Sequence, residues 1–201
     1  MNLDADFWTK RYRDGATGWD AGAITTPLKA YFDQLTDKQT RILIPGAGNS
    51  YEAEYLFKTG FQNVFVIDLS REPLNNLRQR VPDLPQEQLI EGDFFDHSGQ
   101  YDLIVEQTFF CAIDPSLRQR YAEKTYELLR SGGKLVGVLF DEPLNNDYPP
   151  FGGNAAEYRA YFEPLFDFKV FETCYNSIPP RAGRELFIHL TKKEIISSTS
   201  V

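Results

Sequence analysis

Two patterns of apolar and polar positions alternate along this chain. From Arg41 onward, short apolar runs rich in β-branched residues are followed by longer amphipathic segments. The apolar runs predict strands at 41–46, 63–69, 88–95, 101–107 and 133–140, and the amphipathic segments predict helices at 50–60, 71–81 and 115–130. Such alternation is typical of parallel strands joined by crossover helices. Because most of the strand runs are almost continuously apolar, we expect an α/β fold whose sheet is covered on both faces.

The pattern changes after Phe140. The stretch "DEPLNNDYPPFGGN" is rich in Pro, Gly and Asn, which is typical of a loop that carries function or covers a site. A helix is expected near 154–165, and two apolar runs at 168–176 and 184–191 then follow each other with no helix between them. Two such strands predict an antiparallel pair at the edge of the sheet. The final stretch, 194–201, is predicted to be disordered.

The composition narrows the class of protein. A length of 201 residues predicts a single domain, and the net charge of −8 without a basic cluster disfavours a nucleic-acid partner. No leader pattern follows Met1, and no run approaches the roughly 18 apolar residues of a membrane span. We therefore expect a soluble, cytoplasmic monomer that binds neither nucleic acid nor membrane. The two cysteines, Cys111 and Cys174, predict buried free thiols rather than a disulfide or a metal site.

The first predicted strand leads directly into the glycine loop "PGAGNSYEA". Glycines such as Gly46 and Gly48 let a backbone approach a ligand that a Cβ would push away. Asp68 ends the second strand, 22 residues after Gly46. In a doubly wound sheet an acidic side chain at this separation reaches ribose hydroxyls, so we expect a nucleoside site at this edge. The alternative, that the glycines serve only the turn, stays open.

The residues around this loop favour one kind of nucleoside. Tyr51 occupies the third glycine position of the dinucleotide fingerprint, and Glu52 stands in the first helical turn, where a carboxylate would repel a pyrophosphate. A cationic nucleoside without phosphate, such as adenosylmethionine, suits this loop better. In "EGDFFD", Asp93 could accept from the adenine amine while Phe94 lies against the ring. A polar turn at Asp93 with a buried Phe94 is the alternative.

These residues together resemble the thiopurine S-methyltransferase superfamily, and most of all its halide and thiol methyltransferase branch. The similarity runs from about Phe7 to the last strand and includes "FWTKRYRDGATGWDAG", "ILIPGAGNSYEAEYL", "VFVIDLS" and "EGDFFDHSGQYDLIVEQTFFCAIDP". It implies a Rossmann-like class I methyltransferase with a mostly parallel seven-stranded sheet, helices on both faces and an antiparallel edge strand. It also implies one domain over 1–201, in which the segment 1–36 covers the cofactor, S-adenosyl-L-methionine; the product is S-adenosyl-L-homocysteine.

The resemblance also implies which residues bind the cofactor. The matching positions are Trp8, Tyr12, Trp19, Gly46, Gly48, Asp68, Leu69, Asp93, Phe94 and Gln107. Tyr12 stands where relatives commonly have tryptophan, and Gln107 where they have Arg or Tyr, so a side-chain contribution from Gln107 is in doubt. A sulfonium is attracted to aromatic faces, which supports contact with the tryptophans. Packing of Trp8 against the sheet from an amphipathic helix is the alternative.

The methyl acceptor is expected beyond the fourth strand. A substrate pocket is predicted from side chains after that strand and from the proline-rich loop, namely Phe109, Phe110, Cys111, Tyr148, Pro150 and Phe151. Their alternative role is ordinary burial. Arg118 or Arg181 could supply positive potential for an anionic acceptor. Cys111 has no basic neighbour in sequence that would lower its pKa, so we expect a polarizable wall residue rather than a nucleophile.

Methyl transfer to a small soft nucleophile such as a thiol, a thiopurine, bisulfide or a halide demands no strong general base. We accordingly expect no catalytic acid or base and no metal, and His97 and His189 are expected to be structural. Two other functions stay open. A non-catalytic adenosylmethionine-binding module would keep Asp68 and Asp93, and an NAD-dependent oxidoreductase is disfavoured by the missing third glycine.

Overall fold

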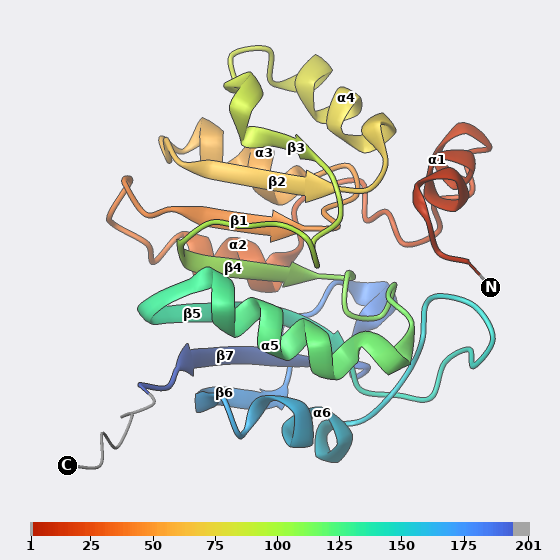
Figure 1. The fold of residues 1–201 in the computed structure, drawn as a ribbon, viewed down its shortest axis with the longest axis vertical. Helices are drawn as coiled ribbons and strands as arrows, with labels where there is room; N and C mark the ends of the chain where they lie inside the picture. The colour runs from red at the N-terminus through yellow and green to blue at the C-terminus, as the bar shows by residue number, and fades with distance from the viewer. Residues whose placement is uncertain (1, 195–201) are drawn as a thin grey trace.

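The computed structural model describes residues 2–194, which form a seven-stranded sheet flanked by helices (Figure 1). The strand order is β3-β2-β1-β4-β5-β7-β6. The strands are β1 (Ile42–Pro45), β2 (Val64–Asp68), β3 (Leu89–Glu91), β4 (Tyr101–Gln107), β5 (Leu129–Phe140), β6 (Phe166–Thr173) and β7 (Glu185–Lys192). Strands β1 to β5 are parallel, and β7 is antiparallel to both of its neighbours. The predicted mostly parallel seven-stranded sheet with an antiparallel strand is confirmed.

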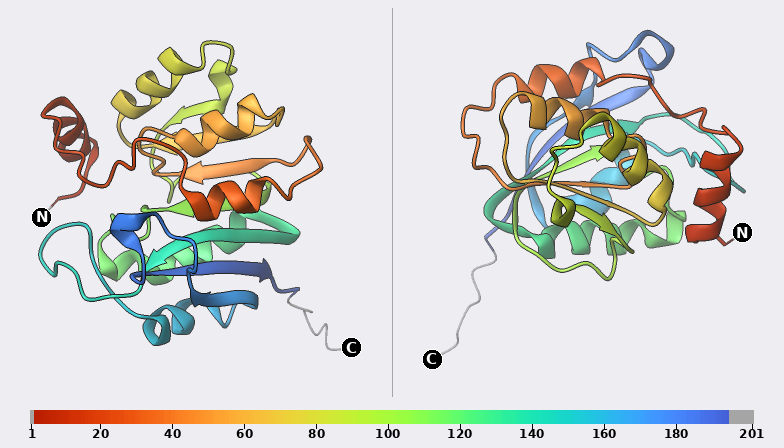
Figure 2. Two further views of the ribbon diagram at one scale, coloured as in Figure 1. Left: turned by 180° about the vertical axis from the view of Figure 1, so that it is seen from behind. Right: turned by 90° about the horizontal axis from the view of Figure 1, so that it is seen from above.

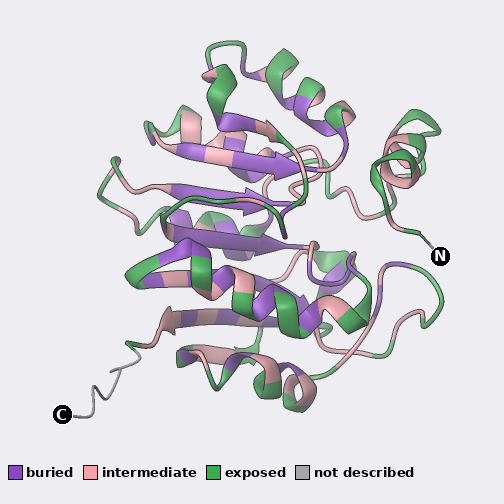
Figure 3. Cartoon of the chain, viewed as in Figure 1, coloured by how far each residue is buried: buried purple, intermediate pink, exposed green. Residues whose placement is uncertain are grey.

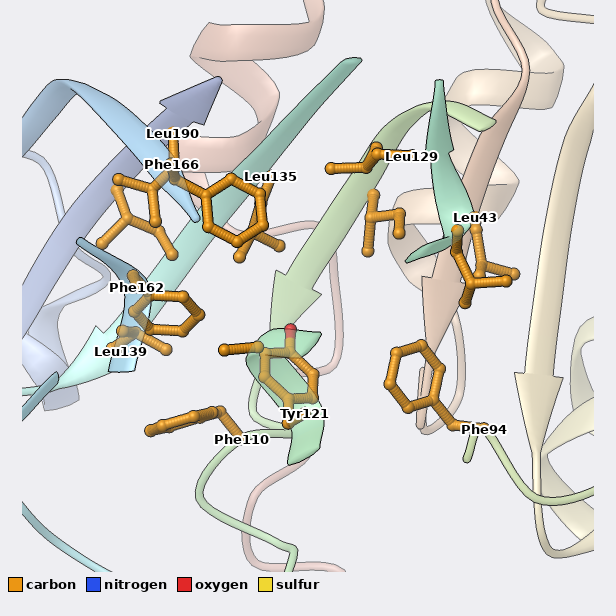
Figure 4. Close-up of a cluster of buried hydrophobic side chains, with 14 of the residues drawn as sticks. Leu43, Phe94, Phe110, Tyr121, Leu129, Leu135, Leu139, Phe162, Phe166 and Leu190 are labelled. Carbon is orange, nitrogen blue, oxygen red and sulfur yellow. The ribbon is translucent and has the colours of Figure 1, made fainter. Parts of the chain in front are cut away.

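Helices cover both faces of the sheet. They are α1 (Ala5–Arg13), α2 (Thr26–Phe32), α3 (Tyr51–Lys58), α4 (Arg71–Arg80), α5 (Arg118–Leu128) and α6 (Ala155–Phe162), with 3₁₀ turns η1 (Gln86–Gln88), η2 (Pro115–Leu117) and η3 (Pro179–Arg181). Successive residues of a strand point to opposite faces, so Leu43 packs in one core with α5 and α6, whereas Ile42 and Ile44 pack in another with α2, α3 and α4. Figure 3 shows how continuously the central strands are buried, and Figure 4 shows the first of these cores.

The antiparallel pair lies at the predicted edge but in an order that the sequence did not indicate. The antiparallel strand is β7, which lies between β5 and β6, so the outermost strand β6 runs in the same direction as β5. Burial explains this order. Leu186, Ile188 and Leu190 of β7 are buried, whereas most residues of β6 are partly or fully exposed, as suits an edge.

Several element boundaries differ from the predictions, most of all around α5, β5 and β3. The helix expected to run to residue 130 ends at Leu128, because Leu129 already pairs with Tyr101 as the start of β5. Gly132, with φ of +69°, lies in a bulge of β5 and does not cap the helix. The strand expected over 88–95 is only Leu89–Glu91, since the chain turns at Asp93. Helix α2 was not predicted.

The N-terminal segment divides into two parts. Helix α1 lies beyond the carboxyl ends of β1 and β4, away from the sheet, whereas α2 packs onto one face (Figures 1 and 2). Most of the tail expected to be disordered, 195–201, lies outside the described residues. Within residues 2–194, no helix is long and apolar enough to span a membrane.

Candidate functional site

A cavity of about 350 Å³ lies at the carboxyl edge of the parallel strands. Eleven of the sixteen predicted site residues line it: Trp8, Tyr12, Trp19, Gly46, Asp68, Leu69, Asp93, Phe94, Phe109, Cys111 and, from the proline-rich loop, Pro150. They come from α1, the loop after it, and the ends of four strands. Crossover connections bring the ends of parallel strands to one edge, which is where open α/β sheets bind ligands.

Asp68 ends β2 with a buried side chain that faces this cavity. The backbone N–H of Ser70 donates to its carboxylate at 2.8 Å, and the N–H of Gly48 also points at it. Burial nevertheless raises the pKa of Asp68 to about 7, because desolvation outweighs these two donors. A carboxylate with so little protein compensation is suited to accept hydroxyl donors from a ligand.

Asp93 and Phe94 have the structural contacts that the sequence left open as an alternative, and both also line the cavity. The Asp93 carboxylate accepts from the N–H of Phe95 at 2.8 Å, so it does stabilise a turn, and the residue also lines the cavity. Phe94 packs against the rings of Phe109 and Tyr121, with centroids 5.4 and 5.5 Å away, and it lines the cavity as well (Figure 4). The core therefore fixes the orientation of this ring.

The N-terminal aromatic residues form one cluster over the glycine loop. The ring of Trp19 meets those of Trp8 and Tyr12 edge to face, each with centroids 5.7 Å apart. A Cβ on Gly48 would lie 3.6 Å from both Trp19 Nε1 and Tyr12 Oη, so the cluster closes directly over that backbone. The alternative for Trp8, burial against the sheet, is wrong, because no residue of α1 is buried.

Glycine is required at position 46 mainly because a neighbouring side chain occupies the space that a Cβ would need. Its φ is +52°, and a Cβ there would lie 2.1 Å from Cδ2 of Phe109. The space that a side chain would fill is therefore occupied by the Phe109 ring, which forms the cavity wall next to the loop. This contact brings the β1 and β4 ends together.

The loop after β4 is held by a buried carboxylate. Glu106 accepts from the backbone N–H groups of Phe109 and Phe110 at 2.8 and 2.9 Å, and from the Tyr121 hydroxyl at 2.7 Å. Thr108 has φ of +61°, an unusual value for a residue with a Cβ, and its hydroxyl donates to the carbonyl of Gln107 at 2.7 Å. This tight turn places Phe109 and Cys111 on the cavity wall.

Cys111 is a wall residue and not an activated thiol. Burial and the nearby Glu106 charge raise the pKa of its thiol to about 12, so it is protonated at neutral pH. Its Sγ donates to the carbonyl of Thr108 at 3.3 Å. A protonated, soft side chain at this position agrees with the expectation from the sequence.

Comparison with known proteins places this arrangement in a family. The thiopurine S-methyltransferase (TPMT) family profile matches residues 3–196, nearly the whole chain. The chain belongs to the thiopurine S-methyltransferase family. The predicted resemblance is confirmed.

Relatives in this family include plant and bacterial proteins. The chain is 28% identical to "Probable thiol methyltransferase 2" of Arabidopsis thaliana, over 96% of its own length and 87% of the relative. It is 28% identical to "Thiocyanate methyltransferase 1" of Brassica oleracea, over 89% and 81% of the two chains. Thiopurine S-methyltransferase of Xanthomonas campestris is 27% identical, over 80% and 82%.

Solved structures show the same fold. The 1,6-didemethyltoxoflavin-N1-methyltransferase of Burkholderia thailandensis, solved with S-adenosylhomocysteine and its substrate, has a TM-score of 0.73 at 18% identity and covers 94% of this chain and 87% of that one. Magnesium protoporphyrin IX methyltransferase of Synechocystis, solved with S-adenosylhomocysteine, has a TM-score of 0.70 at 12% identity, with 94% and 98% covered.

Five of the predicted site residues of this thiopurine S-methyltransferase family member lie outside the cavity lining. They are Gly48, Gln107, Phe110, Tyr148 and Phe151. Phe110 is buried among the rings of Tyr121 and Tyr158, on the core side of the turn (Figure 4). Tyr148 is 52% exposed, and Pro149 and Pro150 line the cavity from the same loop.

Two further predicted positions have structural contacts. The backbone N–H of Phe151 donates to the Cys111 carbonyl at 2.7 Å, which joins the proline-rich loop to the turn after β4. Glu52, expected to face the ligand, is buried and accepts from the N–H of Thr25 at 3.3 Å. It therefore supports the start of α2 and does not act on a ligand in the cavity.

Arg118 and Arg181 do not line the cavity within the part of the chain that the structure describes. Arg118 donates to Glu157 at 2.9 Å and to the carbonyl of Gly152 at 2.9 Å, so it fastens α5 to the end of the proline-rich loop. Arg181 donates to the carbonyl of Trp19 at 2.7 Å and thereby holds the N-terminal segment. Both are buried and have protein partners, so their predicted role in binding an anion lacks structural support.

Several residues of the cavity were not predicted. Among them are Arg11 on α1, Thr108 and Ile113 after β4, and Asp114. The helical period could have revealed Arg11, because it lies three positions after Trp8 and so on the same side of the helix. Nothing in the sequence pattern distinguished the others from core or loop residues. No group of three or more potential metal ligands is found within residues 2–194.

Proposed function

We propose that this protein is an S-adenosylmethionine-dependent methyltransferase that acts on a small, soft nucleophile, with thiols as the leading class. The single observation that carries the proposal is the buried Asp68 carboxylate, which faces the cavity beside the glycine loop and has unused accepting capacity. Membership of the family and the names of the thiol and thiocyanate methyltransferase relatives support the acceptor class.

The described residues fit the cofactor. Asp68 would hold the ribose hydroxyls, Asp93 and Phe94 the adenine, and the rings of Trp19 and Tyr12 the sulfonium side. When bound, S-adenosylmethionine supplies an electrophilic methyl group: its sulfur–methyl bond breaks, a bond from the acceptor sulfur to that methyl forms, and the electron pair of the broken bond stays on the cofactor sulfur. An acceptor thiol loses its proton to solvent.

The protein would orient the two reactants and exclude water from them, rather than supply an acid or a base. His97 contacts the Tyr101 hydroxyl at 2.8 Å and His189 packs against Tyr31, and neither is among the described residues that line the cavity. The wall beside Cys111 and Ile113 is apolar, so an acceptor there would be stripped of water and aligned. This favours an acceptor that is already nucleophilic.

The shape of the cavity favours a catalyst over a pure binding module. Its lining extends past the nucleoside residues to Ile113 and Pro150, which leaves room for a second small molecule. An oxidoreductase that uses NAD has no supporting feature in the site, although Glu52 no longer argues against it, since its side chain lies away from the cavity.

Two measurements test the proposal. Isothermal titration with S-adenosylhomocysteine and with NAD should show binding of the former only; binding of NAD alone would contradict the cofactor assignment. Incubation with S-adenosylmethionine and a panel of iodide, bisulfide, aliphatic thiols and aromatic thiols should yield methylated thiols, detected by mass spectrometry. Binding of S-adenosylhomocysteine without any methylated product across the panel would favour a binding module.

A further inference from the structure

Arg11 presents an unpaired charged donor to the cavity. Its side chain forms no ion pair within residues 2–194, and its Nε is buried with no hydrogen-bond partner there. The neighbouring cations on the same helix differ, because Lys10 pairs with Asp14, and Arg13 donates to Glu72 at 2.7 Å. A buried guanidinium N–H without an acceptor is costly. The Nε of Arg118 is in the same state, so Arg11 is distinguished by its place in the cavity lining and by its lack of any ion pair.

The charge of Arg11 is isolated among the residues that line the cavity. The described lining contains three carboxylates, Asp68, Asp93 and Asp114, and Arg11 is its only cation. Arg118 and Arg181, the other candidates, are engaged with protein acceptors. An anionic group that enters this cavity therefore has one place where its charge is matched.

The position of the guanidinium indicates the end of the cavity that it serves. Its Cζ lies 5.5 Å from the Trp19 ring and 6.0 Å from the ring of Phe7, one turn earlier in α1. The head group therefore runs back along the helix, as helical side chains do, toward the first turn of α1, which lies beside the loop between β5 and α6 (Figures 1 and 2). Pro150 of that loop lines the cavity, whereas Asp93 follows β3, at the other edge of the parallel strands.

We propose that Arg11 determines acceptor specificity by binding a carboxylate on the methyl acceptor, so that the preferred acceptor is a small thiol that also carries a carboxylate. This inference rests on the proposed function. The guanidinium N–H groups form a planar fork that matches the two oxygens of a carboxylate. The aromatic rings of Trp19 and Phe7 lie beside the guanidinium and restrict its position.

Mercaptoacetate and mercaptoethanol form a matched pair of acceptors for the test, since they differ in the carboxylate but share the thiol. In Arg11→Gln, kcat/KM for mercaptoacetate should fall about tenfold or more, the loss expected for a charge-assisted hydrogen bond, while that for mercaptoethanol changes less than about twofold. Arg11→Lys should recover part of the loss, because it keeps the charge without the fork. Lys10→Gln, on the exposed side of the same helix, should leave the ratio unchanged.

An equal fall for both thiols would overturn the inference and leave Arg11 a structural role. Cofactor binding supplies a second decision, because S-adenosylhomocysteine has a carboxylate and methylthioadenosine does not. If Arg11→Gln weakens S-adenosylhomocysteine but not methylthioadenosine, Arg11 binds the cofactor carboxylate and the inference is wrong.

Failure of the proposed function would be seen separately. If the wild-type protein methylates neither thiol, calorimetry of mercaptoacetate binding to the S-adenosylhomocysteine complex still decides the matter. Binding that Arg11→Gln weakens about tenfold supports the carboxylate subsite even without turnover. Absence of binding, or binding that is equal in both proteins, contradicts it.

Discussion

Asp68 keeps a carboxylate where its charge is expensive. It is buried, only two backbone N–H groups point at it, and burial raises its pKa to about 7. A residue selected for stability alone would be neutral at this position. Hydroxyl donors of a ribose would stabilise the ionised form of Asp68. The carboxylate, which is poorly stabilised in the free protein, would therefore contribute to the affinity for the ligand.

We predict that Asp68→Asn weakens S-adenosylhomocysteine binding by roughly 10- to 100-fold, as expected when hydrogen bonds to a charged acceptor are lost. In the wild-type protein, affinity should also fall by about tenfold per pH unit below about 7, because the ligand requires the ionised carboxylate and must displace its proton. The variant should show no such pH dependence. Calorimetry from pH 5.5 to 8.5, a range chosen to be about 1.5 units on either side of this pKa, measures both effects. Unchanged affinity in the variant would refute the ribose role.

The sequence predicted the place of Asp68 but not the surroundings of other residues. A strand end after a glycine loop is a local feature, so Gly46, Asp68 and Asp93 could be located from spacing alone. Whether a side chain faces the cavity or the core depends on the turn that carries it. The left-handed Thr108 turns Phe109 toward Gly46 and Phe110 toward Tyr158, and no periodicity encodes that difference.

At the level of elements, β4 and α5 are joined by the Glu106 carboxylate. One of its oxygens accepts hydrogen bonds from two backbone N–H groups of the turn, and the other accepts one from the Tyr121 hydroxyl of α5. Burial raises the pKa of Glu106 to about 7 in spite of these donors. The carboxylate therefore shapes the cavity wall at a cost in stability near neutral pH.

The pH dependence of this effect on stability follows from the pKa of Glu106 in the folded protein and in the unfolded chain. The folded pKa, about 7, lies above the ordinary value of 4.5, so the folded protein retains a proton between these values that the unfolded chain releases. The contribution to stability is fully present below about 4.5 and is lost as pH rises through about 7. Glu106→Gln should abolish the loss, because the amide oxygen can still accept both backbone N–H groups.

We predict that the free energy of unfolding of Glu106→Gln exceeds that of the wild type at pH 8, by on the order of 3 kcal/mol at most, and that the difference shrinks toward pH 4. Urea unfolding monitored by tryptophan fluorescence across this range measures it. Glu123→Gln, which removes an exposed carboxyl from α5, should show no such trend. Parallel pH profiles of wild type and Glu106→Gln would contradict the assignment.

The boundary between α5 and β5 shows why element ends were harder to predict than elements. Apolar spacing and the two glycines, Gly132 and Gly133, fit a helix that ends in a glycine cap. The pairing of Leu129 with Tyr101 starts the strand earlier and turns the glycines into a bulge. This contact joins residues 28 positions apart in sequence, and local pattern carries no information on it.

At the scale of the whole molecule, the cavity is assembled from segments spread between Asn2 and Pro150. The sheet topology brings the strand ends together, so this edge could be predicted as the site. The position of α1 over this edge was expected only from the family resemblance, because no residue of α1 is buried and the helix is held by a few polar contacts. These include Thr9 with Ser70 at 2.9 Å and Arg13 with Glu72 at 2.7 Å.

A helix attached in this way should open independently of the sheet. We predict that amide hydrogen exchange over residues 5–20 is fast in the free protein and slows about tenfold or more with saturating S-adenosylhomocysteine, because the ligand adds contacts with Trp8, Tyr12 and Trp19 that only the closed segment provides. Exchange of α6, which packs in the core away from the cavity, should change much less. Hydrogen-exchange mass spectrometry separates these segments.

Trp19→Ala should reduce the protection of α1 by the ligand more than that of β4, since Trp19 meets both other rings of the cluster. If α1 in the free protein exchanges as slowly as β4, the segment is a fixed part of the fold and does not close on the ligand.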